Sequence, residues 1–259
     1  MVDDAGPPDT VPSDGAVYTR AVRATPPGRT RTPLDRRRVL AAAIEFIDEH
    51  GLEALTMRRM GAHLGVEGMA LYRHVTGRDD LLDGVVELVV DELYGDPEVY
   101  LAPKYGWQDY LQRLAHGVRR IAIAHPAVFP LIATRPPAAP WIRPPLRSLR
   151  WLESFLDALT THGFSEESAV SAYLAYTSFL LGHLLLEVSQ RGVPISPLDD
   201  ADAKPVADHR ALAQYPHIRR LQPLLSEDES AAEFEESLEN LLERLQRVLR
   251  ESRGPGSTI

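Results

Sequence analysis

The chain has 259 residues, a formal net charge of −9, 44% hydrophobic residues and no cysteine. This length and apolar content suffice for a sizeable core. The lack of cysteine excludes disulfides, thiolate metal sites and a cysteine nucleophile. The sequence has no run of about 18 apolar residues and no N-terminal signal pattern. We therefore expect no membrane partner and a cytoplasmic location.

The charge is divided unevenly along the chain. Residues 1–79 hold 11 basic and 11 acidic residues, whereas residues 80–259 hold 17 and 26, which supplies the whole −9. Residues 16–40 carry seven arginines against one acid. Residues 1–33 are rich in Pro, Gly, Asp, Thr and Arg, a composition that cannot bury enough apolar surface to fold. The sequence thus predicts a disordered basic arm over 1–33, ahead of a neutral segment and an acidic one.

From residue 34 onward the apolar residues recur at helical spacing. The first helix is expected to have an apolar stripe, and Gly51 ends it. The stripe consists of Leu34, Val39, Leu40, Ala43, Ile44 and Ile47. Thr56 is placed to cap a second, short helix, and Gly65 ends that one. Further helices are expected over 78–95, 107–124, 143–163, 166–191 and 230–251, with short ones near 127–136, 210–214 and 218–225. No segment alternates like a strand, so the prediction is an all-α fold.

Two short helices joined by the stretch "LGVE" predict a helix-turn-helix, whose second helix enters the DNA major groove. Short helices joined at glycine also occur in other bundles. Three features favour DNA here: the basic arm that precedes the unit, the phosphate-suited side chains that follow, and the helix start at Gly77-Arg78, whose amides favour an anion. These phosphate-suited side chains belong to Tyr72, His74 and Arg78.

The stretch "LTMRRMGAHLGVEGMALYRHVTGRDDLLD" resembles the DNA-binding domain of the tetracycline-repressor (TetR) family of transcriptional regulators. The resemblance covers residues 35–85 closely, and the rest of the chain matches only as a helical domain of the expected size. It implies a helix-turn-helix three-helix domain over 34–80 and a C-terminal ligand-binding and dimerisation domain over 81–259.

The resemblance also implies roles for individual residues. Thr56 caps the first short helix and lies near phosphate, with Met57 beside it, and Arg58 resembles a base-reading arginine. Gly68, Met69 and Ala70 match the positions that meet bases. Backbone-phosphate positions are matched by Tyr72, His74 and Arg78, and Arg73 suits either role.

The base-facing positions depart from the family pattern, because Gly68, Met69 and Ala70 offer no side-chain hydrogen-bond donor. Apolar contact with a thymine methyl is all that they supply. We therefore expect specificity from other arginines, from DNA shape, or from the arm. Arg20 and Arg23 are the first candidates for a narrow minor groove. The alternative is an arm that only raises non-specific affinity.

In the C-terminal part, the last helix carries Phe234, Leu238, Leu241, Leu245 and Val248 at spacings of 4, 3, 4 and 3. This seam fits either packing within one subunit or packing against a partner. In the family the last helix and the long preceding one form a four-helix bundle between subunits, which implies a homodimer that reads a palindromic operator.

The remaining helices are expected to enclose a ligand cavity. Aromatic residues there fit either a core or a pocket lining, and polar residues inside apolar helices are the better pointers. Several aromatics suggest a large, flat, polycyclic ligand. The candidate ligand-binding residues are Trp107, Tyr110, Gln112, His116, Arg119, Arg120, Phe129, Trp151, Tyr173, Tyr176 and His183.

We expect neither a cofactor nor a metal. The sequence has no HxxxH pair, His50 and Glu53 flank the helix end at Gly51, and His183 with Glu187 would supply only two ligands. No catalytic Ser, His and acid cluster and no Gly-rich phosphate loop is identifiable, so an enzyme is not expected. The prediction is a ligand-responsive repressor, with control of an exporter gene implied by the family. A ligand-independent regulator or an activator is the alternative.

Overall fold

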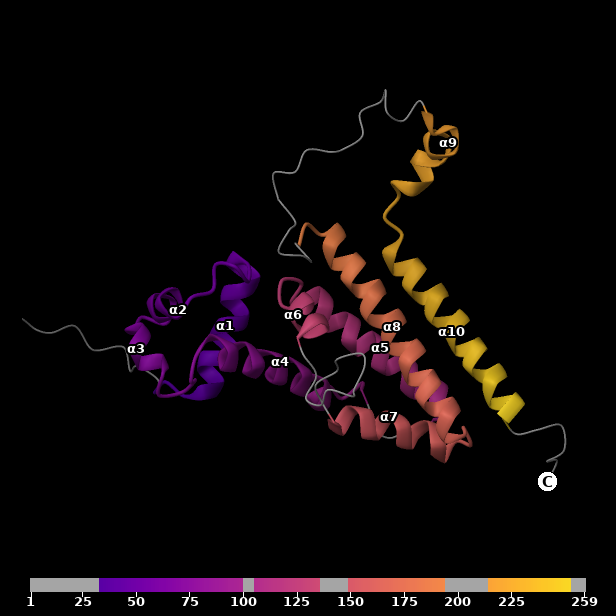
Figure 1. The fold of residues 1–259 in the computed structure, drawn as a ribbon, viewed down its shortest axis with the longest axis horizontal. Helices are drawn as coiled ribbons and strands as arrows, with labels where there is room; N and C mark the ends of the chain where they lie inside the picture. The colour runs from indigo at the N-terminus through magenta and orange to yellow at the C-terminus, as the bar shows by residue number, and fades with distance from the viewer. Residues whose placement is uncertain (1–32, 100–104, 136–148, 194–213, 253–259) are drawn as a thin grey trace, which may run out of the picture. The chain divides into compact units, whose positions relative to one another are not determined.

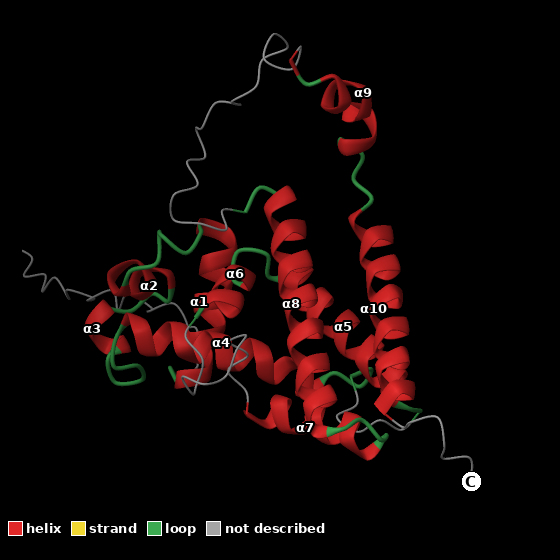
Figure 2. Cartoon of the chain, turned by 45° about the vertical axis from the view of Figure 1, so that its right-hand side comes forward, coloured by secondary structure: helices red, strands yellow, loops and turns green. Residues whose placement is uncertain are grey.

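The computed structural model describes residues 33–99, 105–135, 149–193 and 214–252, and within these ranges it contains helices and no strand (Figures 1 and 2). The all-α prediction is confirmed. The helices are α1 (Arg36–His50), α2 (Met57–His63), α3 (Gly68–Leu71), α4 (Arg78–Gly95), α5 (Trp107–Ala124), α6 (Phe129–Thr134), α7 (Leu149–Thr161), α8 (Glu166–Gln190), α9 (Pro216–Leu225) and α10 (Ser230–Ser252).

Local capping signals set the ends of the first helices. The Asp35 carboxylate accepts a hydrogen bond from the Arg38 amide at the start of α1, and the Thr56 hydroxyl accepts one from the Arg59 amide at the start of α2. Such a cap contributes about 1 kcal/mol. Gly51 ends α1 with a φ of 79°, and Gly65 follows α2 with a φ of 68°, a left-handed region that favours glycine.

Helices α1 and α4 pack against each other and hold α2 and α3 over one end of their shared core. The predicted stripe is buried along α1, whereas Leu34 is half-buried and lies before the helix. Leu71, the last residue of α3, and Val75, four residues later, are buried as well. These two side chains anchor the segment from α3 to Val75 to the core, and its other faces are left for solvent. The α4 helix continues from this unit to α5, across the predicted boundary at residue 80.

An ion pair joins the start of α1 to the start of α4. The Arg36 guanidinium lies 2.7 Å from the Asp80 carboxylate and also donates to the His74 carbonyl oxygen at 3.0 Å. Asp80 further accepts from the Thr76 amide at 2.7 Å. The hydrogen bond from Arg36, followed by the one from the Thr76 amide, lowers the pKa of Asp80 to about 2.

Asp80→Asn should therefore lower the free energy of unfolding by an amount that depends on pH. A depressed carboxyl pKa stabilises the fold above its ordinary value of 3.8, and this stabilisation is lost as the pH falls toward about 2. We expect a difference of about 1 kcal/mol between wild type and variant at pH 7, because the pair is partly exposed. Urea unfolding at pH 7, 4 and 2 measures it. A difference that stays constant over this range contradicts the assignment.

In the C-terminal part of the chain, from α5 onward, α8 contacts α5, α6, α7 and α10 (Figure 1). Its Ser165 cap was predicted and is confirmed, because the side chain accepts from the Ser168 amide. By length and composition, α8 is the one helix of the described residues that could cross a membrane. Its contacts with four neighbouring helices account for this apolarity as that of a core helix.

The buried stripe of α10 differs from the predicted seam. Phe234, Leu238 and Leu245 are buried as expected, but Leu242 and Leu249 are buried in place of Leu241 and Val248, which are half-buried. The reason is that α10 packs on α5 and α8 within the same chain, and the residues facing them follow spacings of 4, 4, 3 and 4. Leu241 and Val248 lie on the flank of this stripe.

The helix expected over 218–225 is α9, which begins at Pro216, and the one expected over 210–214 lies largely outside the described residues. None of the α9 residues is buried. Its exposed apolar side chains, together with that of its cap, are Tyr215, Ile218, Leu221, Leu224 and Leu225.

Candidate DNA-binding face and ligand cavity

Helices α2 and α3 cross at very short range. A Cβ atom added to Gly61 would lie 2.6 Å from the Gly68 amide nitrogen and 2.9 Å from the Val66 carbonyl oxygen. The Val66 amide also donates to the Gly61 carbonyl at 2.8 Å. Gly61 was not singled out from the sequence, although it lies four residues before the turn glycine. This close crossing fixes the angle at which α3 is presented.

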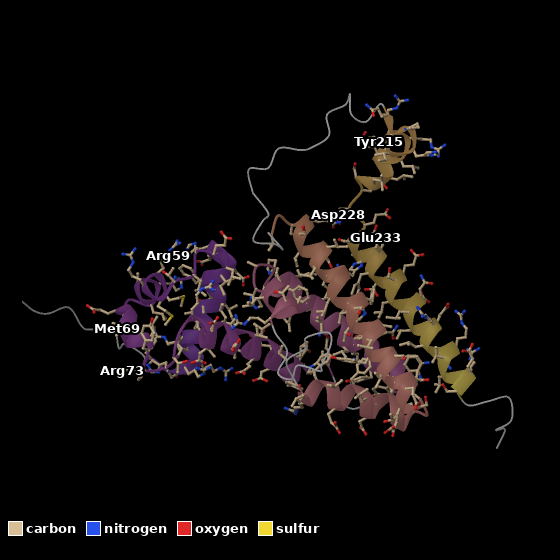
Figure 3. All side chains as sticks on the ribbon, viewed as in Figure 1. Arg59, Met69, Arg73, Tyr215, Asp228 and Glu233 are labelled. Carbon is tan, nitrogen blue, oxygen red and sulfur yellow. The ribbon has the colours of Figure 1, made fainter. Side chains whose placement is uncertain are left out.

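The outer face of this unit carries much of the predicted DNA-binding set. Met69 is 74% exposed and Tyr72 is 47% exposed. Arg58, Arg73 and the neighbouring Arg59 are exposed too, and Figure 3 labels Arg59, Met69 and Arg73 at the margin of α2 and α3. Met57, Ala70 and His74 are half-buried. The face therefore combines arginines with a tyrosine and one large apolar side chain.

Gly68 and Arg78, two of the residues predicted to contact DNA, also make contacts within the protein that the sequence did not reveal. A Cβ atom on Gly68 would lie 3.0 Å from the Met57 carbonyl oxygen, so this glycine lets α3 approach the start of α2. The Arg78 guanidinium donates to the Leu55 carbonyl at 3.2 Å and to the Leu52 carbonyl at 3.3 Å. Arg78 thus holds α4 to the α1–α2 connection, which leaves only its remaining N–H groups for phosphate. Arg20 and Arg23 lie outside the described residues.

An apolar cavity lies among α4, α5, α6, α7 and α8. As it stands, the cavity offers about 30 Å³ to the centres of water-sized molecules, so a larger ligand must widen it. Of the predicted ligand-binding residues, it brings together Phe129 and Trp151. Thr177 is the polar member of the lining, and its hydroxyl donates to the Tyr173 carbonyl at 2.7 Å. The other lining residues, missed by sequence reasoning, are Val89, Val90, Leu93, Val118, Ile121, Ile132, Leu180 and Leu181.

The other predicted aromatic residues lie in the core outside this cavity. Trp107 meets Phe164 edge to face, with ring centroids 5.1 Å apart. The Tyr176 hydroxyl donates to the Leu111 carbonyl at 2.7 Å, and burial raises the pKa of this phenol well above its ordinary value. Burial also raises the pKa of Tyr110 and of Tyr173. Tyr173 and Tyr176 of α8 both contact the Phe155 ring of α7, each at a centroid distance of 5.4 Å.

The predicted polar residues are engaged with the protein itself. Arg119 makes two hydrogen bonds with Glu187, at 2.8 and 3.0 Å, and Arg120 pairs with Asp96 and Glu98. The second arginine is exposed. His116 lies 3.6 Å from the Glu235 carboxylate and His183 lies 3.3 Å from the Ser230 carbonyl. Gln112 is exposed and lines a polar groove between α5 and α10. Their roles toward a ligand stay predictions.

Two polar contacts on either side of α6 tie its flanking residues to α1 and α4. His125, the C-cap of α5 and four residues before α6, lies 2.7 Å from the Asp48 carboxylate of α1, and this hydrogen bond raises the pKa of His125. Arg135, just after α6, donates to the Asp83 carboxylate of α4 at 2.8 Å. Both residues flank a helix that supplies Phe129 and Ile132 to the cavity. In the sequence, His125 and Arg135 each precede a proline, so they were interpreted only as turn residues.

Known proteins share both parts of the chain. The family described as "Bacterial regulatory proteins, tetR family" matches residues 39–85, and "Tetracyclin repressor-like, C-terminal domain" matches residues 101–249. The HTH-type transcriptional repressor DrrR1 of Streptomyces coeruleorubidus is 26% identical over 84% of this chain and 79% of its own. The Tetracycline repressor protein class C of Escherichia coli is 32% identical over 59% and 65%.

A crystal structure of a possible TetR family transcriptional regulator from Streptomyces coelicolor A3(2) shares the fold, with a TM-score of 0.66 and 29% identity over 83% of this chain and all of the other. The helix-turn-helix and the helical C-terminal part, each matched by its own family model, are those of a transcriptional regulator. The chain belongs to the TetR family of transcriptional regulators.

Proposed function

We propose that the chain is a cytoplasmic, homodimeric repressor that binds a palindromic operator and is released by a hydrophobic or polycyclic, antibiotic-like ligand. The observation that carries the proposal is the exposed face of α2 and α3, which presents Arg58, Met69, Tyr72 and Arg73. The same chain has an apolar cavity among α4 to α8. In this proposal the regulated gene encodes an exporter. Relatives named as repressors, among them a tetracycline repressor, support it.

On DNA, the tyrosine and arginine side chains hold backbone phosphates and set the register of α3. Met69 supplies apolar contact with base edges, and thymine methyls are the groups that it suits. Arg58 is the candidate for a bidentate contact with guanine. Because few side chains contact bases, the arginines of the arm are proposed to add specificity by recognising the shape of the DNA.

Arg73→Ala should weaken operator binding and reduce its salt dependence. Each phosphate contact that is lost lowers the slope of log affinity against log salt by about 0.9, and a dimer loses two. Fluorescence anisotropy with an operator duplex at several salt concentrations measures both quantities. Arg219→Ala, a change to an exposed arginine on α9, is the matched control. Unchanged affinity in Arg73→Ala would remove this residue from the interface.

Deleting residues 1–25, which include Arg20 and Arg23, should lower operator affinity and flatten the salt dependence as well. A loss on the operator that exceeds the loss on random DNA indicates specific minor-groove contacts. Equal losses on both duplexes indicate an electrostatic role alone. If affinity and salt slope both stay at their wild-type values, the arm has no part in binding.

The dimer is proposed to form through α8 and α10. Helix α8 carries large apolar side chains that the chain itself leaves exposed, those of Val170, Leu174 and Leu186. On α10, Leu241 and Val248 flank the stripe that packs within the chain. A second copy that covers these side chains forms a four-helix bundle. Two reading heads then match two half-sites of a palindrome.

The ligand is proposed to enter the apolar cavity and to act on DNA binding through α6. Phe129 and Ile132 line the cavity from α6, while His125, at the end of α5, and Arg135, just after α6, attach the flanks of this helix to α1 and α4. A ligand that shifts α6 changes both attachments and thus the placement of the reading heads. A 100-fold loss of DNA affinity corresponds to about 2.7 kcal/mol of coupling between the two sites.

A mobility-shift assay with the DNA upstream of the protein's own gene tests the proposal, with a panel of polycyclic antibiotics added. Retardation that one compound abolishes is the expected result. Binding of that compound should also quench the fluorescence of Trp151 in a Trp107→Phe, Trp141→Phe background. DNA binding that no compound releases would instead indicate a regulator that acts without ligand. The neighbouring genes then show whether an exporter is the target.

A further inference from the structure

The ends of α1 and α2 bring three metal-ligating side chains together on the surface of the DNA-binding unit. Donor atoms of Glu49, His50 and His63 all lie within 4.8 Å of one another, and the His50 Nε2 and Glu49 Oε2 atoms are 3.8 Å apart. Glu49 and His50 end one helix and His63 ends the next. The sequence places His63 in another element from the other two, so it gave no sign of this cluster.

We propose that Glu49, His50 and His63 form a binding site for a borderline divalent transition-metal ion such as Zn²⁺. Two imidazole nitrogens and one carboxylate oxygen are the donors that such ions take, whereas Mg²⁺ and Ca²⁺ prefer oxygen alone. Three protein ligands leave a coordination position for water. With neutral imidazoles and one carboxylate, the donor set carries a charge of −1.

The surroundings of the cluster favour a cation in two ways. Both histidines are the last residues of their helices, where the negative end of the helix dipole lies. Phe46 is buried beneath them and meets both imidazoles edge to face, at centroid distances of 4.7 Å for His50 and 5.5 Å for His63. This contact turns the two rings toward a common point.

The donor atoms must move closer together to coordinate an ion, because they now lie within 4.8 Å of one another. Bond lengths of 2.0–2.1 Å in a tetrahedral zinc site place donor atoms roughly 3.3 Å apart. All three side chains are exposed, and exposed side chains change rotamer within nanoseconds, so they can close around an ion. Arg59 places a positive charge near the site that would repel a bound cation, since its guanidinium lies 5.4 Å from the centre of the Phe46 ring.

A bound ion would link the end of α1 to the end of α2 and so brace the helix-turn-helix against the rest of its unit. Because the ion binds the folded site, free metal at 100 times its dissociation constant lowers the unfolding constant about 100-fold. The site requires no operator and no ligand in the cavity. Its test is thus independent of the proposed repressor function.

The test compares the full chain, stripped with a chelator, with and without added ZnCl₂. Wild type should bind one Zn²⁺ per chain by calorimetry, unfold at a higher temperature with zinc, and give the visible absorption bands of tetrahedral Co²⁺ when cobalt replaces it. His50→Ala and His63→Ala should lose all three responses, and circular dichroism checks that both fold. His217→Ala, a change to an exposed histidine on α9, should keep them. MgCl₂ should produce none of them.

Zinc binding that survives in both His50→Ala and His63→Ala overturns the proposal, as does an equal response to magnesium. Failure of wild type to bind zinc at micromolar concentrations overturns it too. Arg59→Gln provides a further check on the site, because removal of the nearby positive charge should tighten zinc binding several-fold. An Arg59→Gln variant that binds zinc more weakly would place the ion elsewhere.

Discussion

Arg119→Ala should lower the free energy of unfolding by about 3–5 kcal/mol, a large share of the stability of an ordinary domain. The Glu187 carboxylate is 3% exposed, and Arg119 donates two hydrogen bonds to it from the facing helix α5. Alanine removes both and leaves a buried carboxylate whose remaining partner is Arg191, at 3.4 Å. The guanidinium also lies 5.2 Å from the centre of the Phe234 ring, so α10 loses a contact as well.

Arg120→Ala is the matched control for this change. The residue is next in sequence and also pairs with acids, but its side chain is 45% exposed. An exposed pair contributes about 0–1 kcal/mol. Chemical denaturation at a fixed protomer concentration measures both variants, because dimerisation would make the apparent stability depend on concentration. Similar losses in the two variants would show that burial of Glu187 does not decide the effect.

A double variant separates the ion pair from the space that it fills. Arg119→Met with Glu187→Leu replaces the pair by apolar side chains of similar volume, which is often neutral or stabilising. We expect this double variant to recover most of the stability that Arg119→Ala loses. If it is as unstable as Arg119→Ala, the loss comes from packing against Phe234 and not from an unpaired charge.

The contrast between these two arginines shows where sequence reasoning reached its limit. Arg119 and Arg120 looked alike as polar residues inside an apolar helix, and both were candidates for the ligand. Which of them faces α8 depends on a rotation of 100° around the helix axis and on a partner 68 residues away. Periodicity predicts that a helix has two faces, but it does not identify the group that meets each face.

The DNA-binding unit was predictable because its signals are local. Thr56, Gly51 and Gly65 act on backbone groups within a few residues, and each does so in the structure. Burial of the α1 stripe followed from its spacing. Contacts between elements were less accessible. The hold of Arg78 on two carbonyl groups, and the Arg36 bond to the His74 carbonyl, depend on how α1, α3 and α4 meet.

The cavity was the least predictable part, because a cavity is what packing leaves unfilled. From the sequence, polar residues inside apolar helices were the better candidates and aromatic residues fitted either a core or a lining, yet only the aromatic Phe129 and Trp151 of the predicted set line the cavity. The other rings fill the core, and the lining is completed by valine, leucine and isoleucine from four helices. Such residues are typical of any helix core. Only the relative placement of the helices distinguishes a lining leucine from a packed one.

Gly61→Ala should destabilise the helix-turn-helix by about 1–3 kcal/mol and reduce operator affinity further than the loss of folded protein explains. The added Cβ would meet the Gly68 nitrogen at 2.6 Å, the Gly68 Cα at 2.8 Å and the Val66 carbonyl oxygen at 2.9 Å. All three are backbone atoms, so no side chain can turn aside. The start of α3 must move away from α2, and the residues that meet DNA move with it.

Gly95→Ala is the control for this last change, since a Cβ at this position in the final turn of α4 meets nothing within 4 Å. Alanine there should be neutral or slightly stabilising, because it favours the helix. Anisotropy with operator DNA at a temperature where both variants are folded separates misplacement of α3 from unfolding. A Gly61→Ala variant with wild-type stability and affinity would mean that α2 and α3 tolerate a wider crossing. The presentation of α3 would then be set by the Leu71 and Val75 anchors alone.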